Sequence, residues 1–345
     1  MVSSRRSSES GVGADGSDGS GMGSDGSGVG SDIESSRRRQ KPLSIVRQPA
    51  HDDVGRAVDG SRTLRVRRTG SSVTAMVDTQ FSDRRLASLY DLFCPWDQRG
   101  DFTFYLPLVM SARSVLDVGC GTGALLRRAR EDGHEGRLCG LDPGVGMLEV
   151  ARECPDVEWV LGDLASAPGW SRAFDLVVMT GHAFQGLLGD DELRDALAAI
   201  ATALTDDGRF VFETRNPLVR EWEDWDVRYS GEVVDPTGAV VRCVCEVETP
   251  VRGDLVSATH TYTGAGWERP LLSRSTLRFL GPDALAGFLG EAGLVVAEQF
   301  GDWDGGPLTD TGPEIITVAR HPRGERDGRA ALAVSVMDAR PSPSA

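Results

Sequence analysis

The sequence has almost no lysine and no paired cysteines. Lys41 is the only lysine among 37 basic residues, and the others are arginine. None of the cysteines belongs to a C-x-x-C pair and no secretory segment precedes them, so we expect reduced thiols and neither a disulfide framework nor a metal site. The six cysteines are Cys94, Cys120, Cys139, Cys154, Cys243 and Cys245.

Long apolar runs are also missing. No stretch approaches the ~20 residues that a membrane-spanning helix needs, and we therefore expect a cytoplasmic protein with no membrane partner. The formal net charge of the chain is -15, although residues 1–77 carry a small excess of basic residues. The rest of the chain is strongly acidic and would repel phosphate backbones, so no nucleic-acid partner is expected.

Large apolar side chains are scarce in residues 1–77, where Gly, Ser, Asp and Arg alternate. Ordering this stretch would lose backbone entropy with no core burial to offset it, which predicts a disordered tail. Residues 78–320 are sufficient for one globular α/β domain. Residues 321–345 are rich in Arg, Gly, Ser and Pro, and they are predicted to form a flexible C-terminal tail.

Apolar runs alternate with helical patterns through most of residues 78–320. Two short amphipathic helices are expected first, over residues 83–93 and 98–110. Five apolar runs follow, separated by Gly-rich turns and helical intervals, and this alternation predicts a doubly wound, mostly parallel sheet. The runs lie at residues 114–118, 137–141, 157–161, 174–179 and 209–213, the helical intervals near 123–133, 145–153 and 190–204, and a last helix and two strands near 282–292, 294–299 and 314–319.

The helical period disappears between residues 216 and 280. Residues 240–247 and 255–262 alternate apolar and polar side chains instead, and Pro236-Thr237-Gly238 marks a turn. We therefore expect an antiparallel β insertion of three or four strands after the fifth parallel strand. Because ligands in doubly wound sheets bind outside the carboxyl ends of the strands, functional residues are sought in the turns that follow each run.

The strongest motif is V-L-D-V-G-C-G-T-G at residues 115–123. It predicts a buried strand that ends in a turn, where Gly119 and Gly121 let the backbone approach a ligand. Gly119, Gly121 and Ala124 also satisfy the G-x-G-x-x-A fingerprint of dinucleotide-binding enzymes. A nicotinamide-dependent oxidoreductase is therefore an alternative at this point.

Acidic residues follow the next two strands. Asp142 closes the second strand, where a carboxylate can accept hydrogen bonds from both ribose hydroxyls in either class of protein. Asp163 lies in Gly162-Asp163-Leu164 after the third strand, where a carboxylate can accept a hydrogen bond from an adenine amino group. A dinucleotide-binding fold does not require this acid, so Asp163 weighs against the oxidoreductase.

Five motifs in order resemble the class I S-adenosylmethionine-dependent methyltransferases of the small-molecule type, over roughly residues 80–320: V-L-D-V-G-C-G-T-G, G-L-D, G-D-L, F-D-L-V-V and L-x-x-x-G-R-F. The resemblance implies a Rossmann-like, seven-stranded sheet whose last strand is antiparallel, with S-adenosyl-L-methionine as cofactor. It also implies in-line methyl transfer to a nitrogen or oxygen nucleophile of a small molecule. A cofactor-binding regulator without catalysis is a third interpretation.

Residues 216–280 lie where small-molecule methyltransferases often carry a segment that covers the substrate. Enzymes that methylate exocyclic amines of nucleic-acid bases would show N/D-P-P-Y/F after the fourth strand, and this chain has Thr180-Gly181-His182-Ala183 there. The resemblance also assigns the cofactor contacts: the methionine portion to Gly119, Gly121 and Gly123, its amino group to Asp117, the ribose to Asp142, the adenine to Asp163 and Leu164, and a further contact to Met179 at the end of the fourth strand.

Methyl transfer needs few catalytic side chains, because the sulfonium already makes the methyl group electrophilic. His182 follows the fourth strand and should face the transferring methyl group. With an unperturbed pKa of ~6.5 it would serve as a base or orient the substrate, and a structural role is the alternative. Tyr90 and Tyr105 are candidates for the acceptor pocket, with core packing as the alternative. Trp96 beside Asp97 could hold an organic cation or act as a packing anchor.

Overall fold

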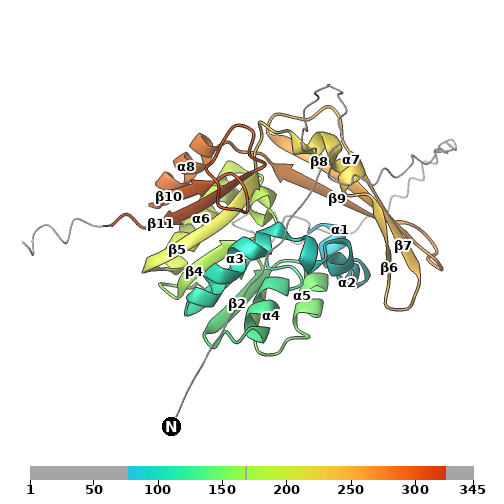
Figure 1. The fold of residues 1–345 in the computed structure, drawn as a ribbon, viewed down its shortest axis with the longest axis horizontal. Coiled ribbons are helices and arrows are strands. Elements are labelled where there is room, and N and C mark those ends of the chain that lie inside the picture. The colour runs from blue at the N-terminus through green and yellow to red at the C-terminus, as the bar shows by residue number, and fades with distance from the viewer. Residues whose placement is uncertain (1–76, 168, 324–345) are drawn as a thin grey trace, which may run out of the picture. The chain divides into compact units, whose positions relative to one another are not determined.

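The computed structural model describes residues 77–167 and 169–323 of the chain (Figure 1). The tails expected at residues 1–77 and 321–345 therefore lie almost entirely outside the described residues. All six cysteines are described, and each is a free thiol in this structure.

Six helices lie where the apolar periodicity predicts them, with ends that differ by one or two residues, whereas the short helices α1 and α7 were not predicted. Short 3-10 turns are added at η1 (Trp96–Gln98), η2 (Ala183–Gly186) and η3 (Glu221–Asp224). The helices are α1 (Thr79–Ser82), α2 (Arg84–Phe93), α3 (Gly100–Ser111), α4 (Ala124–Glu131), α5 (Val145–Ala151), α6 (Asp190–Ala203), α7 (Trp225–Arg228) and α8 (Pro282–Glu291).

The strands also follow the predicted runs, and only the fifth is much longer than expected. It begins directly after α6, because Leu204 already pairs with Phe174. The strands are β1 (Ser114–Val118), β2 (Arg137–Asp142), β3 (Glu158–Leu161), β4 (Phe174–Met179), β5 (Leu204–Arg215), β6 (Gly231–Val234), β7 (Val240–Val247), β8 (Leu255–Gly264), β9 (Leu271–Arg278), β10 (Val295–Phe300) and β11 (Glu314–Arg320).

Seven of these strands form one sheet in the order β10-β11-β5-β4-β1-β2-β3. β1 pairs in parallel with β2 and β4, while β3 continues the sheet beside β2 and β5 continues it beside β4. β11 lies between β5 and β10 and is antiparallel to both. The predicted fold class, a doubly wound, mostly parallel α/β sheet of seven strands with its last strand antiparallel, is confirmed.

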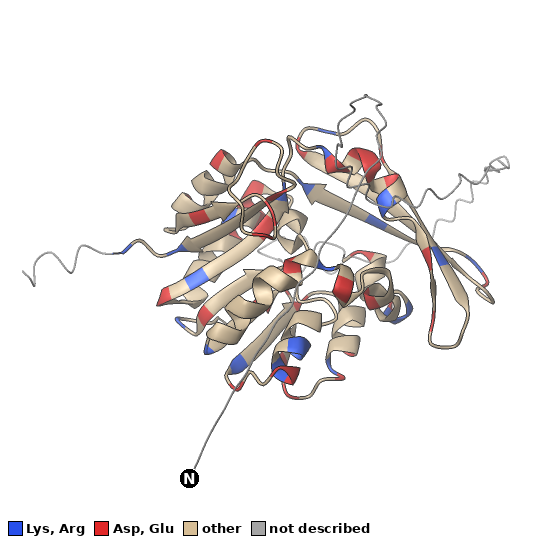
Figure 2. Ribbon diagram, in the orientation of Figure 1, with Lys and Arg blue, Asp and Glu red and all other residues tan. Residues whose placement is uncertain are grey.

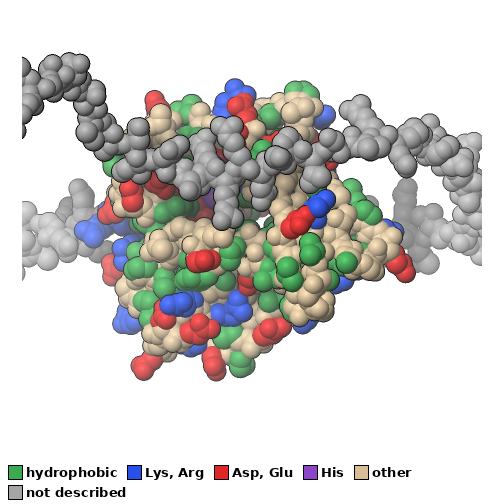
Figure 3. Space-filling model, turned by 45° about the vertical axis from the view of Figure 1, so that its right-hand side comes forward, with side chains coloured by type: hydrophobic (Ala, Val, Ile, Leu, Met, Phe, Trp, Pro, Cys, Tyr) green, Lys and Arg blue, Asp and Glu red, His purple; other side chains and the backbone are tan. Residues whose placement is uncertain are grey.

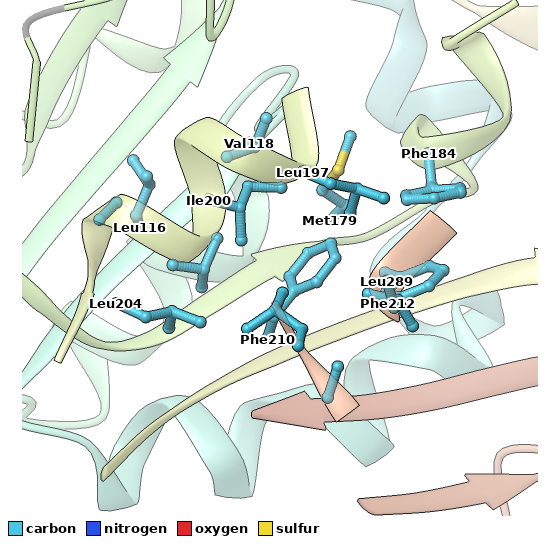
Figure 4. Packing of buried hydrophobic residues seen from close by; sticks show 14 of the residues in the cluster. Leu116, Val118, Met179, Phe184, Leu197, Ile200, Leu204, Phe210, Phe212 and Leu289 are labelled. Atoms are coloured by element: carbon cyan, nitrogen blue, oxygen red, sulfur yellow. The ribbon is translucent and has the colours of Figure 1, made fainter. Parts of the chain in front are cut away.

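Alternating positions of the strands face two layers of helices. In β5, Phe210 and Phe212 pack into a buried cluster with α6 and α8, whereas Val211 belongs to a second cluster with α3 and α4. Figure 4 shows the first cluster, with Leu197 of α6 and Leu289 of α8 beside the two phenylalanines. Burying one such side chain stabilises the fold by ~1.5–3 kcal/mol. The carboxyl edge of the sheet, where the turns of interest lie, therefore rests on a well-packed core.

The predicted antiparallel β insertion is present between β5 and α8. β6, β7, β8 and β9 form a four-stranded sheet in that order, and each neighbouring pair is antiparallel. Along β7 the buried Val241, Cys243 and Cys245 alternate with the exposed Val240 and Val244. One face of the insertion is therefore packed and the other faces solvent.

Helices α1 and α2 connect this insertion to α5 (Figure 1). The backbone N–H of Gln80 donates to Ser273 Oγ at 2.9 Å, and the Tyr262 hydroxyl donates to Gln80 Oε1 at 3.1 Å. On the other side, a Cβ at Gly146 of α5 would lie 2.9 Å from the carbonyl carbon of Asp83. The absence of a side chain at Gly146 therefore allows the N-terminal helices to approach α5 closely.

Charged side chains are spread over the described surface. Acidic residues gather on η3 and α7 (Figure 2), and on the face drawn in Figure 3 charged and apolar side chains are interspersed. Many arginines pair with carboxylates, such as Arg84 with Glu149 at 3.3 Å, and exposed pairs of this kind add little stability. None of the helices in residues 77–167 and 169–323 has both the length and the apolar character that crossing a membrane requires.

Candidate functional site

The turn after β1 is fixed by hydrogen bonds to the neighbouring strand. Gly119 donates its backbone N–H to Leu141 O at 2.7 Å. Asp142 joins this turn to the one after β2, because Oδ2 accepts from the Gly121 N–H at 2.8 Å and Oδ1 from the Gly144 N–H at 2.7 Å. Burial raises the pKa of Asp142 to about 6, and the two hydrogen bonds oppose that rise.

The three glycines of this turn have different neighbours. A Cβ at Gly119 would lie 2.7 Å from the Ala183 side chain, and a Cβ at Gly123 would collide with the Trp159 ring, so packing alone accounts for these two. A Cβ at Gly121 would meet nothing within 4 Å. Gly121 has a φ of +56°, which favours glycine, and it borders open space. A ligand can approach the backbone of the turn at this residue.

Asp117, near the end of β1, has an unpartnered carboxylate oxygen. The residue is 1% exposed, and Oδ1 has no hydrogen-bond partner among the described residues. Burial raises the pKa of Asp117 to about 8, the charge of Asp142 adds to the rise, and Arg99 opposes it. A buried acid without a partner is destabilising unless a ligand supplies the missing donor. A cationic amino group has the required charge and the required N–H.

The residues assigned to the adenine and to the end of β4 differ in burial. Asp163 is exposed, and its Oδ1 accepts the N–H and the O–H of Ser166 at 2.8 and 2.6 Å. Leu164 is half-buried beside the apolar core. Met179 is 3% exposed and packs in that core near Phe184 (Figure 4). Because the Met179 side chain faces the core, only its backbone is available for a cofactor contact.

His182 is held in an unusual backbone conformation after β4. Its φ is +63°, in the left-handed region, and its N–H donates to Glu213 Oε1 at 2.7 Å. The imidazole Nε2 lies 3.1 and 3.0 Å from the two carboxylate oxygens of Glu314. Burial lowers the pKa of His182 well below its usual range, and the charge of Arg215 lowers it further. The expectation of an ordinary imidazole pKa is therefore wrong, because it ignored burial and a buried guanidinium.

Tyr105 is a core residue that holds Glu213. It is 0% exposed, and its hydroxyl donates to Glu213 Oε2. Burial raises the pKa of Glu213 to about 8, and the charge of Asp101 raises it further. Tyr105 therefore reaches the turn after β4 through Glu213, and the structure places no exposed part of it in an acceptor pocket.

The first turn of α3 brings a buried ion pair to the same region. Arg99 Nε and Nη2 lie 2.9 and 2.5 Å from the two oxygens of Asp101, and the guanidinium lies 4.0 Å from the centre of the Phe102 ring. A Cβ at Gly181 would lie 3.2 Å from Arg99 Nη2, so the pair adjoins the turn after β4. Sequence reasoning did not single out either member of the pair.

Tyr90 and Trp96, the other two residues suggested for the acceptor pocket, have different surroundings. Tyr90 is half-buried with its ring edge-to-face with Phe81 at 6.3 Å, and burial and nearby charges raise its pKa. Trp96 stacks on Phe102 at 4.4 Å and has the Arg128 guanidinium 5.3 Å from its ring centre. The structure thus shows Trp96 as a packing residue between α3 and α4, while Tyr90 shares the neighbourhood of Arg99.

Arg215 at the end of β5 connects the insertion to the turn after β4. Its Nη1 donates to Gln185 Oε1 at 3.1 Å and its Nη2 to the Tyr229 hydroxyl at 2.9 Å. Its Nε lies 3.6 Å from Glu221 and has no hydrogen-bond partner among the described residues. The guanidinium also lies 5.1 Å from the centre of the Trp225 ring.

Sequence reasoning missed the buried acids beside His182. Glu213 stands in the otherwise apolar run Phe210-Val211-Phe212, and a charged residue in a buried strand is the signal that could have revealed it. Glu314 directly precedes a similar run and gives a weaker signal. No group of three or more His, Cys, Asp or Glu side chains in the described residues is arranged to hold a metal ion.

Comparisons with known proteins point to the same region of the chain. The sequence profile of the family described as "Methyltransferase domain" matches residues 115–208. The chain is 28% identical to the 2-phytyl-1,4-naphtoquinone methyltransferase of Thermosynechococcus vestitus, over 47% of this chain and 76% of that protein. It is 27% identical to the demethylmenaquinone methyltransferase of Thermotoga maritima, over 62% of this chain and 86% of that protein.

Two solved structures have the same fold. The CcbJ methyltransferase from Streptomyces caelestis matches with a TM-score of 0.54 and 23% sequence identity, over 68% of this chain and 96% of that chain. An S-adenosylmethionine-dependent methyltransferase from Clostridium acetobutylicum matches with a TM-score of 0.55 and 15% identity, over 69% of this chain and 98% of that chain.

Proposed function

Because the chain is a class I S-adenosylmethionine-dependent methyltransferase, we propose that it transfers a methyl group by in-line displacement to a nitrogen or oxygen nucleophile of a small molecule. Its cofactor is S-adenosyl-L-methionine. Relatives whose names refer to quinones support a small-molecule acceptor. The sequence left two alternatives open, a nicotinamide-dependent oxidoreductase and a regulator without catalysis. Neither agrees with a chain that belongs to the methyltransferases.

The observation that carries the proposal is the unpartnered Oδ1 of Asp117 beside a glycine turn that has open space at Gly121. A ligand that completes this site needs a cationic donor for the buried carboxylate and a slender portion that fits against the backbone. The methionine portion of the cofactor has both, because its amino group is cationic at neutral pH and its chain is unbranched. The residues present therefore fit the cofactor.

In this proposal Asp117 binds the cofactor's amino group and Gly121 lines its methionine portion, while Gly119 and Gly123 shape the turn. Asp142 binds the ribose, because each of its oxygens accepts one backbone N–H and keeps a lone pair for a hydroxyl. The exposed Asp163 accepts from the adenine amino group, and Leu164 provides an apolar contact. The backbone of Met179 provides the last of the proposed cofactor contacts.

The cofactor supplies an electrophilic methyl group, so the protein's own residues orient the acceptor, exclude water and take up a proton. His182 is assigned the last task. Its lowered pKa keeps the imidazole neutral at neutral pH, and a neutral imidazole can accept a proton directly. Nε2 is engaged with Glu314, so Nδ1 is the nitrogen that can face an acceptor.

Transfer from a methyl-labelled cofactor to a metabolite extract tests the proposal. We expect label in the low-molecular-mass fraction and a product about 14 mass units heavier than its precursor, as replacement of H by CH₃ requires. Label that enters only protein or nucleic acid would contradict a small-molecule acceptor. No transfer to any fraction by a chain that binds the cofactor would contradict the activity itself.

Two glycine variants provide a matched control. Gly121 and Gly133 both have positive φ and open space where a Cβ would lie, so Gly121→Ala and Gly133→Ala should introduce similar strain, on the order of 1–2 kcal/mol. Only Gly121→Ala should abolish transfer, because only that Cβ would occupy the cofactor's space. Equal loss in both variants would show that strain, and not a ligand, explains the glycine.

A further inference from the structure

The turn after β4 contains two successive residues in the left-handed region. Gly181 has a φ of +65° and His182 a φ of +63°. Glycine adopts this conformation without strain, whereas a histidine keeps it only where neighbouring groups hold it there. Among the described residues, the other two with positive φ that are not glycine, Arg172 and Arg220, are exposed, while the His182 side chain is only 17% exposed. The conformation of His182 therefore depends on its neighbours.

Glu213 of β5 provides the contact that holds the His182 backbone. Met179, the last residue of β4, is in register with Phe212, so Glu213 lies beside the point where the chain leaves the sheet. Its Oε1 accepts the backbone N–H of His182 at 2.7 Å. Alternation along β5 places the Glu213 side chain on the α3 side of the sheet, where the Tyr105 hydroxyl donates to Oε2. Glu213 therefore connects α3 to the backbone of the turn.

The His182 ring is fixed by a different segment of the chain. Both carboxylate oxygens of Glu314 on β11 lie within hydrogen-bond distance of Nε2, at 3.1 and 3.0 Å. The Trp303 ring, between β10 and β11, packs edge-to-face on the imidazole with 6.5 Å between the ring centres. The position of Nδ1 depends on both sets of contacts, since a shift of the backbone at His182 carries the ring with it.

Stability alone gives no reason for an acid at position 213. Glu213 is 0% exposed and follows an apolar run, where an apolar side chain would avoid the free-energy cost of burying a polar group. Because burial raises the pKa of Glu213 to about 8, the carboxyl group is mostly protonated at neutral pH. A protonated carboxyl group keeps both contacts, since its C=O accepts the N–H and its O–H donates to the Tyr105 oxygen. The contact with the turn therefore needs a hydrogen-bonding group at this position and not a charge.

We propose that Glu213 is a positioning residue for methyl transfer, because its hydrogen bond to the His182 N–H holds the turn after β4, and with it the imidazole, in place. Tyr105 orients Glu213 from α3. The inference rests on the proposed function, in which His182 takes up a proton, and it extends that function to two buried residues that act through His182. Displacement of a catalytic group by about 1 Å can lower a rate by about 10²-fold, so loss of this hydrogen bond should reduce turnover.

Three variants and one control test the proposal. Glu213→Met keeps the length of the side chain but leaves the His182 N–H without an acceptor. Glu213→Gln keeps both contacts, because its amide oxygen accepts the N–H and its amide nitrogen donates to Tyr105. Tyr105→Phe removes only the hydroxyl that orients Glu213. His134→Phe is the control, because it removes a buried hydrogen bond to Ala112 O, 2.8 Å long, just before β1 and so at the opposite edge of the sheet.

Amide hydrogen exchange tests the structural part of the proposal without an acceptor. Exchange in a peptide that spans residues 180–186 should be at least about tenfold faster in Glu213→Met than in wild type, because the His182 N–H loses its acceptor. Glu213→Gln and His134→Phe should exchange near the wild-type rate in this peptide. Equal rates in Glu213→Met and wild type would overturn the proposal, since Glu213 would then not hold the turn.

The product of the metabolite screen identifies an acceptor for kinetics. Glu213→Met should lower kcat by about 10²-fold, while S-adenosylhomocysteine affinity stays near wild type because the turn after β1 has its own hydrogen bonds to Leu141 and Asp142. Tyr105→Phe should lose about tenfold and Glu213→Gln less than about threefold. If Glu213→Met does not fold, an unchanged kcat in Tyr105→Phe overturns the proposal. A merely structural Glu213 would lower the melting temperature, as in His134→Phe, and leave turnover per folded molecule normal.

A double-variant cycle separates the inference from the proposed function. If His182→Ala by itself leaves turnover unchanged, the role proposed for His182 fails. If His182→Ala lowers turnover, adding Glu213→Met to it should lower kcat by less than about threefold further, because Glu213 acts only through the imidazole. A further loss of about 10²-fold would show that Glu213 acts independently of His182, and the inference would then fail while the function stands.

Discussion

The affinity for S-adenosylmethionine should rise with pH because of one buried carboxyl group. Asp117 has a pKa of about 8 in the free protein, chiefly through burial. The cofactor's amino group binds well only to the ionised carboxylate. Below about pH 8 Asp117 must therefore lose a proton on binding, and this loss weakens the apparent affinity.

The size of the effect follows from the pKa. Each pH unit below the pKa costs about tenfold in affinity once the group is mostly protonated, which corresponds to about 1.4 kcal/mol. Between about pH 6 and about pH 7.5, where the cofactor's own amino group is mostly protonated, a pKa of about 8 predicts roughly 25-fold tighter binding at the higher pH. This difference is about 2 kcal/mol.

Titration calorimetry in buffers of different ionisation enthalpy measures both the affinity and the protons released. Wild type should release up to one proton per cofactor at about pH 6, since Asp117 is then almost fully protonated before binding. Asp117→Asn cannot ionise, so its affinity should be lower and should depend much less on pH. Wild-type affinity that is flat over this range, or an equal slope in Asp117→Asn, would refute the assignment of Asp117 to the amino group.

Three further predictions follow from the same structure. The free energy of unfolding without cofactor should fall as pH rises from about 4 to about 8, and Asp117 should contribute up to about 1.4 kcal/mol per pH unit, because its pKa is near 3.8 in the unfolded chain and about 8 in the folded one. In chemical denaturation at several pH values, the free energy of unfolding of Asp117→Asn should therefore depend less steeply on pH. Asp142→Ala should weaken cofactor binding by roughly 1–3 kcal/mol in calorimetry, and unchanged affinity in a folded variant would remove its ribose role. His182→Ala should keep cofactor affinity and lose at least ~10²-fold in turnover, whereas a loss below ~10-fold would show that His182 is not the base.

The fold and the cofactor turn could be predicted because their signals are local. Apolar runs that alternate with helical patterns predict a parallel sheet, and the glycines after the first run predict the turn that follows β1. Even there, the sequence could not distinguish the three glycines. Gly123 is required by the ring of Trp159, which lies on β3, and this contact appears only when the sheet is assembled.

The acceptor side of the site depends on contacts between distant segments. Glu314 reaches His182 because β11 inserts next to β5, where Glu314 pairs in register with Arg215. Nothing in the local sequence around His182 indicates a carboxylate 132 residues away at its Nε2. The same contacts overturn the ordinary imidazole pKa that the sequence suggested, because burial and Arg215 are both consequences of tertiary structure.

Calorimetric titration of the wild-type chain with S-adenosylmethionine and with NAD tests the central claim most directly. The cofactor should bind at one site per chain, and NAD should show no measurable binding, because a dinucleotide has no ammonium group that could donate to the buried Asp117 carboxylate. Gly121→Ala should abolish the S-adenosylmethionine signal, and Gly133→Ala should retain it. Binding of NAD without binding of S-adenosylmethionine would contradict the account.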